Sequence, residues 1–283
     1  MNKPPLLRRA RQAWKRRRFQ HSGLKPWSKG YVEYKLHEIA RVLQAGDFQA
    51  DQLPSGYGWR LDERIVEYPW FFSRLPAAPG LLLDAGSILN FEFLLEHPAL
   101  QNKRLHICTL APEPDCFWHK GVSYLFDDLR RLPYRDDMFD WAVSISTLEH
   151  VGMDNTLLYT ADPSKKESQL RDCLKAVAEL KRVLKPGGAL YASVPFGRAR
   201  DHGWLQIFDQ AGIDGLIGAF RPDTCLLNYF LYHPEGWRPS TALEAGDATF
   251  FDIHHASGYD ADFAASARAV CCLELKKAAD AGH

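Results

Sequence analysis

The sequence predicts an α/β protein with a mostly parallel sheet, and three observations support this. Short apolar runs of strand length alternate with stretches of helical spacing, which is typical of strands joined by crossover helices. The clearest helical stretch covers residues 170–184 and leads directly into Pro186 and two glycines, which end helices. Several apolar runs end in small or acidic residues. The expected strands are residues 81–85, 105–110, 122–126, 139–145 and 189–194, with two more at 225–232 and 267–275.

The first 77 residues are expected to form helices that precede this sheet. Apolar side chains recur at helical spacing among arginines in residues 5–18, which predicts a basic amphipathic helix. A second helix is expected at residues 31–45, and an aromatic helix begins at Glu67. We therefore divide the chain into a basic N-terminal arm, a helical cap, a main domain and a short tail, at residues 1–30, 31–77, 78–276 and 277–283.

Charge is unevenly spread along the chain, although 35 basic residues balance 35 acidic ones. Residues 1–29 contain ten lysines or arginines and no acidic residue, so the rest of the chain is acidic. A basic arm on an acidic body is typical of attachment to an anionic partner, such as a membrane surface or nucleic acid. The alternative is a solvated, partly helical extension that packs nowhere.

The six cysteines form no Cys-x-x-Cys pair, and most of them fall within apolar runs. This pattern is typical of buried thiols in a reducing compartment, and no metal site is expected. No apolar run approaches the length of a membrane span. The expected location is the cytoplasm, with residues 1–29 attaching the protein to an anionic membrane surface.

Chemistry is expected beyond the carboxyl ends of the parallel strands, where such sheets bind ligands. The first strand ends in Asp84 and Gly86. The glycine lets the backbone approach a ligand, while the aspartate either binds ligand groups or organises the loop. The most informative stretch is residues 127–151. It contains an acidic loop with a Leu-Pro turn, a second acidic turn, a buried strand and finally the pair Glu149-His150.

These motifs, which cover residues 78–200, resemble those of the class I S-adenosylmethionine (SAM) dependent methyltransferases, most closely the type 11 group. The resemblance implies a Rossmann-like methyltransferase fold, with a doubly wound, mostly parallel seven-stranded sheet whose last two strands form an edge hairpin. It also implies SAM as the cofactor. One departure concerns the glycine loop, because Ile88 and Asn90 stand where the family has further glycines.

The resemblance also implies which residues bind the cofactor. Asp128 would accept a hydrogen bond from the adenine amino group, and the backbone N–H of Leu129 would donate to the ring. Thr109 or Glu113 would replace the acid that holds the ribose, with a surface role as the alternative for Glu113. Asn90 would cap the helix that follows it. The whole expected set is Asp84, Gly86, Ser87, Asn90, Thr109, Glu113, Asp128, Leu129 and Ser146.

Residues near the methyl group are candidates for catalysis and for acceptor binding. His150 and His202 are the candidate general bases, which predicts a rate that rises with pH through the histidine range. The alternative for His150 is structural support of its loop. Family members hold the acceptor over the ends of the fourth and fifth strands. Aromatic and basic side chains would grip an anionic or sugar-like acceptor there, namely Tyr68, Trp70, Arg198, Arg200 and Trp204.

The predicted function is therefore SAM-dependent methylation of an oxygen or nitrogen in a polar small molecule or saccharide-type acceptor. The alternative is a non-catalytic methyltransferase-like binding or scaffold protein, which the missing glycines and the missing ribose acid favour. Methylation of nucleic-acid bases is not expected, because no Asn/Asp-Pro-Pro-Tyr motif follows the fourth strand. The absence of Gly-x-Gly-x-x-Gly and Gly-x-x-x-x-Gly-Lys argues against enzymes that use dinucleotides or nucleoside triphosphates.

Overall fold

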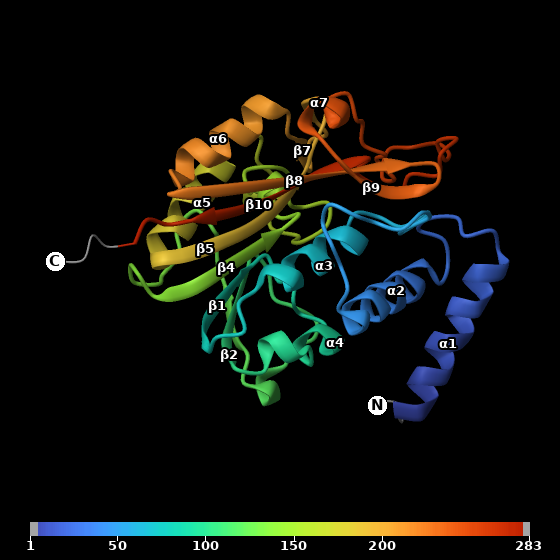
Figure 1. Cartoon of the computed structure of the whole chain (residues 1–283), viewed down its shortest axis with the longest axis horizontal. Helices are drawn as coiled ribbons and strands as arrows, with labels where there is room; N and C mark the ends of the chain where they lie inside the picture. The colour runs from blue at the N-terminus through green and yellow to red at the C-terminus, as the bar shows by residue number, and fades with distance from the viewer. Residues whose placement is uncertain (1–4, 280–283) are drawn as a thin grey trace.

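The computed structural model describes residues 5–279 and contains one eight-stranded sheet with helices on both faces (Figure 1). The parallel strands are β1 (Gly80–Ala85), β2 (Lys103–Thr109), β3 (Ser123–Phe126), β4 (Phe139–Ile145) and β5 (Leu184–Pro195). The antiparallel strands are β8 (Thr224–His233), β9 (Gly236–Ser240) and β10 (Ala269–Lys276). Their order across the sheet is β3-β2-β1-β4-β5-β10-β8-β9, which confirms the predicted doubly wound, Rossmann-like architecture.

The sequence predicted a sheet of seven strands, whereas the structure contains a sheet of eight. β8 and β10 pair antiparallel as expected, but they do not form the edge hairpin, because β9 follows β8 in the chain, pairs with its outer side and forms the edge. This edge strand has the sequence Gly-Trp-Arg-Pro-Ser, which contains a proline and lacks an alternation of apolar and polar residues. A proline is tolerated on an edge strand, because one side of such a strand needs no ladder hydrogen bonds.

Alternate residues of the strands serve two separate cores, as the two-residue period of a strand requires. Leu82 of β1 packs with the cap helices α2 (Tyr31–Ala45) and α3 (Arg64–Arg74) and with the short α4 (Glu92–Leu95). Its neighbour Leu83 packs on the other face with α5 (Asp172–Val183) and α6 (Gln210–Phe220). Residues 31–77 therefore share a continuous core with the sheet, and α3 buries eight consecutive residues in it.

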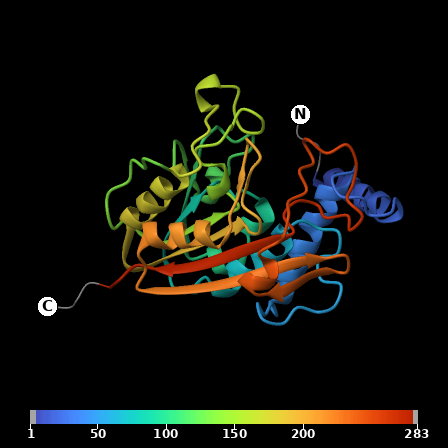
Figure 2. The same ribbon diagram turned by 90° about the horizontal axis from the view of Figure 1, so that it is seen from above.

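The N-terminal helix α1 (Pro5–His21) lies beside α2, at the opposite end of the molecule from the C-terminus (Figure 2). Phe19 is fully buried, and its ring contacts those of Tyr31 and Tyr34 at centroid distances of 5.8 and 5.3 Å. The expectation that the arm packs nowhere is therefore wrong for the C-terminal part of α1. Trp14, five residues before Phe19 on the same helix, is 55% exposed.

The segment after α1 is tied to a loop near the C-terminus. The indole N–H of Trp27 donates to the carbonyl of Ala265 over 2.5 Å, and the hydroxyl of Tyr259 donates to the carbonyl of Pro26 over 2.7 Å. These contacts join residues more than 230 positions apart in the sequence. Among residues 5–279, no helix has both the length and the apolar character needed to cross a bilayer.

Candidate active site

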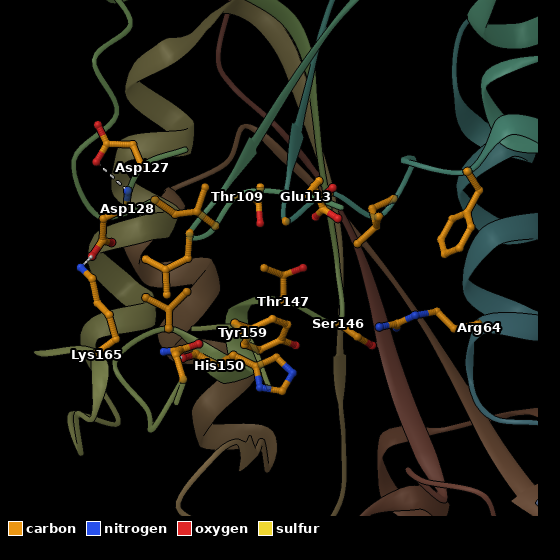
Figure 3. A pocket seen from close by; sticks show the side chains of 18 of the residues that line it. Arg64, Thr109, Glu113, Asp127, Asp128, Ser146, Thr147, His150, Tyr159 and Lys165 are labelled. Atoms are coloured by element: carbon orange, nitrogen blue, oxygen red, sulfur yellow. Dashed lines mark hydrogen bonds and ion pairs between the residues drawn. The ribbon is translucent and has the colours of Figure 1, made fainter. Parts of the chain in front are cut away.

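A cavity of about 350 Å³ lies over the carboxyl ends of β1 to β4. Its volume lies within the range of roughly 300–1,000 Å³ that is usual for small-molecule sites. The strand-end loops, α2, α3 and residues 152–171, which we call the lid, form its walls (Figure 3). The sequence-predicted site residues that line it are Tyr68, Gly86, Ser87, Thr109, Glu113, Asp128, Leu129, Ser146 and His150.

The loop after β1 brings the backbone directly against the loop after β4. Gly86 has a φ of +129°, and an added Cβ would collide with the side chain of Thr147. The next residue, Ser87, has a φ of 62°, and its buried hydroxyl has no hydrogen-bond partner. Because buried polar groups are nearly always hydrogen-bonded, an unpaired hydroxyl in a cavity wall indicates a position for a polar group of a ligand.

Asp84 organises this loop and does not line the cavity. Its fully buried carboxylate accepts hydrogen bonds from the backbone N–H groups of Ile88 and Leu89, over 3.1 and 2.8 Å. Burial raises the pKa of Asp84 to about 7. Of the two roles considered for this residue, the structure therefore supports the organisation of the loop.

The expectation that Asn90 caps the following helix is wrong. Helix α4 begins at Glu92 with Phe91 in the cap position, so Asn90 lies one residue too early. Its side chain instead donates to the carbonyl of Asp115 over 2.9 Å and accepts from the hydroxyl of Tyr124 over 2.7 Å. Asn90 thus joins two neighbouring loops behind the cavity wall.

Asp128 faces the cavity, but Arg130 already holds its carboxylate. The guanidinium of Arg130 donates to Asp128 over 2.6 Å and also binds Glu167 and Asp172. Lys165 of the lid approaches Asp128 to 3.9 Å (Figure 3). Burial acts to raise the pKa of Asp128, but the hydrogen bonds from Arg130 outweigh it and hold this pKa below its usual range. One arginine therefore fastens the lid to the loop after β3.

His150 lies in the cavity wall beside Tyr159 of the lid (Figure 3). Its Nδ1 lies 2.9 Å from the backbone carbonyl of Trp204, and its ring stacks on that indole at 5.4 Å. A carbonyl only accepts hydrogen bonds, so Nδ1 carries the proton and Nε2 keeps a free lone pair. Burial lowers the pKa of His150 to about 4. If His150 is the general base, the rise in rate is therefore expected below the ordinary histidine range.

Helix α3 contributes an ion pair that the sequence analysis missed. The carboxylate of Glu67 is fully buried and accepts from the hydroxyls of Ser146 and Ser193, both over 2.7 Å. Its other oxygen accepts from Arg64 over 2.6 Å, and Arg64 reaches the cavity. Glu67 lies within an aromatic helix, and no local pattern indicates that it points toward the ends of β4 and β5.

Glu149 lies behind His150 and has an unsatisfied oxygen. The residue is 3% exposed, its Oε2 has no hydrogen-bond partner, and its Oε1 lies 4.0 Å from Nε2 of His150. Burial raises the pKa of Glu149 well above its usual range. No group of three or more metal-ligating side chains occurs among residues 5–279.

The predicted acceptor-binding residues do not form one cluster. Trp70 is fully buried, and its indole N–H donates to Asn228, so its assignment to the acceptor site is wrong. Arg198 lies outside the cavity, exposed beside Asp247. Helical geometry explains part of this result, because residues two apart on α3 point in nearly opposite directions, and Tyr68 is the one that faces the cavity.

A second, more open hollow of about 470 Å³ lies beside the small ribbon of β6 (Arg200–Asp201) and β7 (Gln206–Ile207). Arg200 and His202 line this hollow and not the cavity that contains His150. The Nδ1 of His202 lies 3.1 Å from a carboxylate oxygen of Asp252. The structure therefore separates the two candidate histidines and leaves His150 at the strand ends.

Residues 106–192 match the family model for the type 11 methyltransferase domain. This match agrees with the strand order and with a cavity at the carboxyl ends of the parallel strands. This match, which covers less than half of the chain, supports a class I SAM-dependent methyltransferase domain with SAM as its cofactor. The resemblance inferred from the strand-end motifs is thus confirmed.

One curated relative is a tRNA (carboxymethyluridine(34)-5-O)-methyltransferase from Arabidopsis thaliana, 28% identical over 140 residues. The match covers 46% of this chain and only 28% of that relative. Similar solved structures include 1,6-didemethyltoxoflavin-N1-methyltransferase from Burkholderia thailandensis, at 14% identity and a TM-score of 0.44 over 98% of this chain and 92% of the other. Another is a possible histamine N-methyltransferase from Thermotoga maritima, at 16% identity and a TM-score of 0.46 over 85% and 99%.

Proposed function

We propose that this protein transfers the methyl group of SAM to an oxygen or nitrogen of a polar acceptor, which binds between the cap and the ends of β4 and β5. The observation that carries this proposal is the geometry of His150. Its ring is fixed in the wall of the cavity, and its unprotonated Nε2 is available to accept a hydrogen bond from an acceptor O–H or N–H group.

The strand-end loops contain suitable groups for each part of the cofactor. The backbone at Gly86 and the unpaired hydroxyl of Ser87 would hold the methionine part. Thr109 or Glu113, both in the cavity wall, would bind the ribose hydroxyls. Asp128 and the backbone of Leu129 would bind the adenine. At the two departures from the family's glycine loop, Ile88 contributes to the cavity wall, and Asn90 binds the carbonyl of Asp115 and the hydroxyl of Tyr124 outside it.

The cofactor supplies a sulfonium methyl group with an excellent leaving group, so the protein mainly has to position the acceptor and exclude water. The lid and α2 cover the cavity for this purpose. His150 would take up the acceptor's proton as the new bond to the methyl carbon forms. Arg64, which Glu67 holds in place, would orient an anionic or hydroxyl group of the acceptor.

The acceptor class that we propose is a polar small molecule or a saccharide. A second candidate is RNA, for which α1 carries exposed arginines and the Arabidopsis relative acts on tRNA by its name. Attachment of α1 to an anionic membrane surface is part of the same proposal, since exposed Trp14 and the arginines offer both apolar and basic groups. The rival function, non-catalytic binding, would need only the cofactor pocket.

Two measurements test this proposal. Titration calorimetry with SAM and with S-adenosylhomocysteine should show one binding site, and Asp128→Ala should weaken binding by about 1–3 kcal/mol. Asp247→Ala, which alters a 95% exposed carboxylate, is the matched control. The absence of any heat at millimolar SAM would exclude the enzymatic function.

The second measurement follows tritium from labelled SAM into saccharide and RNA fractions. Transfer to the saccharide fraction is the expected result. Transfer to RNA alone would select the second candidate acceptor. Cofactor binding without transfer to either fraction or to small polar metabolites would favour the non-catalytic function.

A further inference from the structure

Trp204 holds His150 through its backbone and through its ring. Its carbonyl accepts from Nδ1 of His150 over 2.9 Å, and the two rings stack with an angle of 29°. Tyr159 of the lid contacts the imidazole at a centroid distance of 5.4 Å with its plane nearly perpendicular. The carbonyl of Trp204 therefore determines which nitrogen of His150 carries the proton.

Asp252, in turn, holds Trp204. Its Oδ2 accepts from the indole N–H of Trp204 over 3.2 Å and lies 3.1 and 2.9 Å from the Nδ1 atoms of His202 and His255. Its other oxygen accepts from the backbone N–H of His254 over 3.1 Å. The side chain of Asp252 is only 11% exposed, so these four donors are its main partners among the described residues.

We infer that Asp252 is a positioning residue for methyl transfer, which acts on His150 through Trp204. This inference rests on the proposed function, because it assigns a role in the same reaction. Asp252 touches neither the cavity nor His150. Asp252 fixes the indole, and the indole fixes the backbone carbonyl and the face on which the imidazole stacks. The stacking orients the ring, and the carbonyl keeps the proton of His150 on Nδ1.

The tautomer decides what the cavity offers to the acceptor. With the proton on Nδ1, Nε2 presents a lone pair to an acceptor O–H or N–H group. With the proton on Nε2, the same atom becomes a donor and can take up no proton. A neutral imidazole that is free of its carbonyl partner populates both forms. Loss of the link to Asp252 should therefore lower the fraction of molecules that are competent for transfer.

The test measures the tautomer directly and needs no acceptor. Nitrogen-15 spectra of protein labelled at histidine distinguish a protonated ring nitrogen from one with a lone pair, and His150→Gln identifies the signals. In the wild-type protein, Nδ1 of His150 should be protonated and Nε2 should not. Trp204→Phe retains the stacked ring and the carbonyl but removes the indole N–H, and Asp252→Ala removes its acceptor.

Both variants should show a mixture of the two tautomers, and the double variant should show no more of the wrong form than either single one. Arg198→Ala, on the same segment but exposed, should leave the spectrum unchanged. Once an acceptor is known, Trp204→Phe and Asp252→Ala should lower kcat by about 10- to 100-fold with little change in the KM for SAM.

Wild-type signals of His150 in both single variants would overturn the inference, because the carbonyl of Trp204 would then hold the ring without help from Asp252. If Asp252→Ala fails to fold, Trp204→Phe alone decides the question. The failure of the proposed function would be visible separately, as an absence of SAM binding or of methyl transfer by wild-type protein that shows the expected tautomer.

Discussion

The buried carboxylate of Glu67, on helix α3, accepts a hydrogen bond of 2.7 Å from the hydroxyl of Ser146, at the end of β4. This contact joins the cap to the point where the methyl acceptor is proposed to bind. The same carboxylate neutralises Arg64, whose guanidinium lies in the cavity wall. The cap is thus bonded to the sheet through the candidate site itself.

Replacement of Glu67 by alanine should destabilise the protein by about 3–5 kcal/mol, because it leaves a largely buried arginine without its partner. Urea denaturation measures the effect. Glu38→Ala, which removes a pair with the exposed Arg41, should cost less than about 1 kcal/mol. If Glu67→Ala also loses less than about 1 kcal/mol of stability, water must enter the site and solvate Arg64.

Gly86→Ala should abolish the binding of S-adenosylhomocysteine and reduce stability. The added Cβ would collide with Thr147, and a φ of +129° strains any residue that has a Cβ. The matched control is Gly218→Ala in helix α6, where the added Cβ meets no atom within 4 Å. This second change should stabilise the protein by about 0.5–1 kcal/mol. Normal ligand binding by Gly86→Ala would mean that the two loops can separate.

The loss of folding stability at acidic pH should depend on His150. Burial lowers its pKa to about 4, from a value of 6.5 in the unfolded chain. As the pH falls, the unfolded state therefore takes up the proton first. The folded protein loses stability between these two pKa values, on the order of 2 kcal/mol by pH 5.

His150→Gln should remove this part of the pH dependence, as measured by urea denaturation at pH 7 and pH 5. His119→Gln changes an exposed histidine and serves as the control. If proton uptake by His150 sets the pH dependence of turnover, the rate should likewise stay constant from pH 8 to about 5. A rate that rises between pH 6 and 7 would assign the proton transfer to another group.

Two residues of the N-terminal helix should have different roles, one in stability and the other in membrane binding. Phe19→Ala should lower the free energy of unfolding by about 3 kcal/mol, because the ring is fully buried against α2. Trp14→Ala should leave stability unchanged but weaken sedimentation with phosphatidylglycerol vesicles. Unchanged stability in Phe19→Ala would instead support the alternative of an N-terminal extension that contributes no packing.

Arg130→Gln should loosen the lid, because this side chain joins Asp128 to Glu167 and Asp172. Hydrogen exchange of residues 152–171 should become faster, and the affinity for S-adenosylhomocysteine should change as Asp128 is released. Arg131→Gln alters an exposed neighbour and is the control. Unaltered exchange in Arg130→Gln would mean that packing alone holds the lid.

The sequence predicted most of the sheet because buried parallel strands appear as short, continuous apolar runs. The bounds of β4 agree with the expectation, and those of β1 to β3 differ by at most two residues. The strand-end residues were predicted for a similar reason, since the carboxyl ends of parallel strands meet at one edge. The walls contributed by α2, α3 and the lid depend on tertiary packing. Local patterns therefore did not reveal Arg64, Glu67 or Tyr159 as site residues.

The lid covers both ends of the cavity as one continuous segment. Lys165 and Glu167 lie over the loop that would hold the adenine, while Tyr159 lies against His150 at the acceptor end. A movement of this one segment would therefore uncover the cofactor end and the acceptor end of the cavity together.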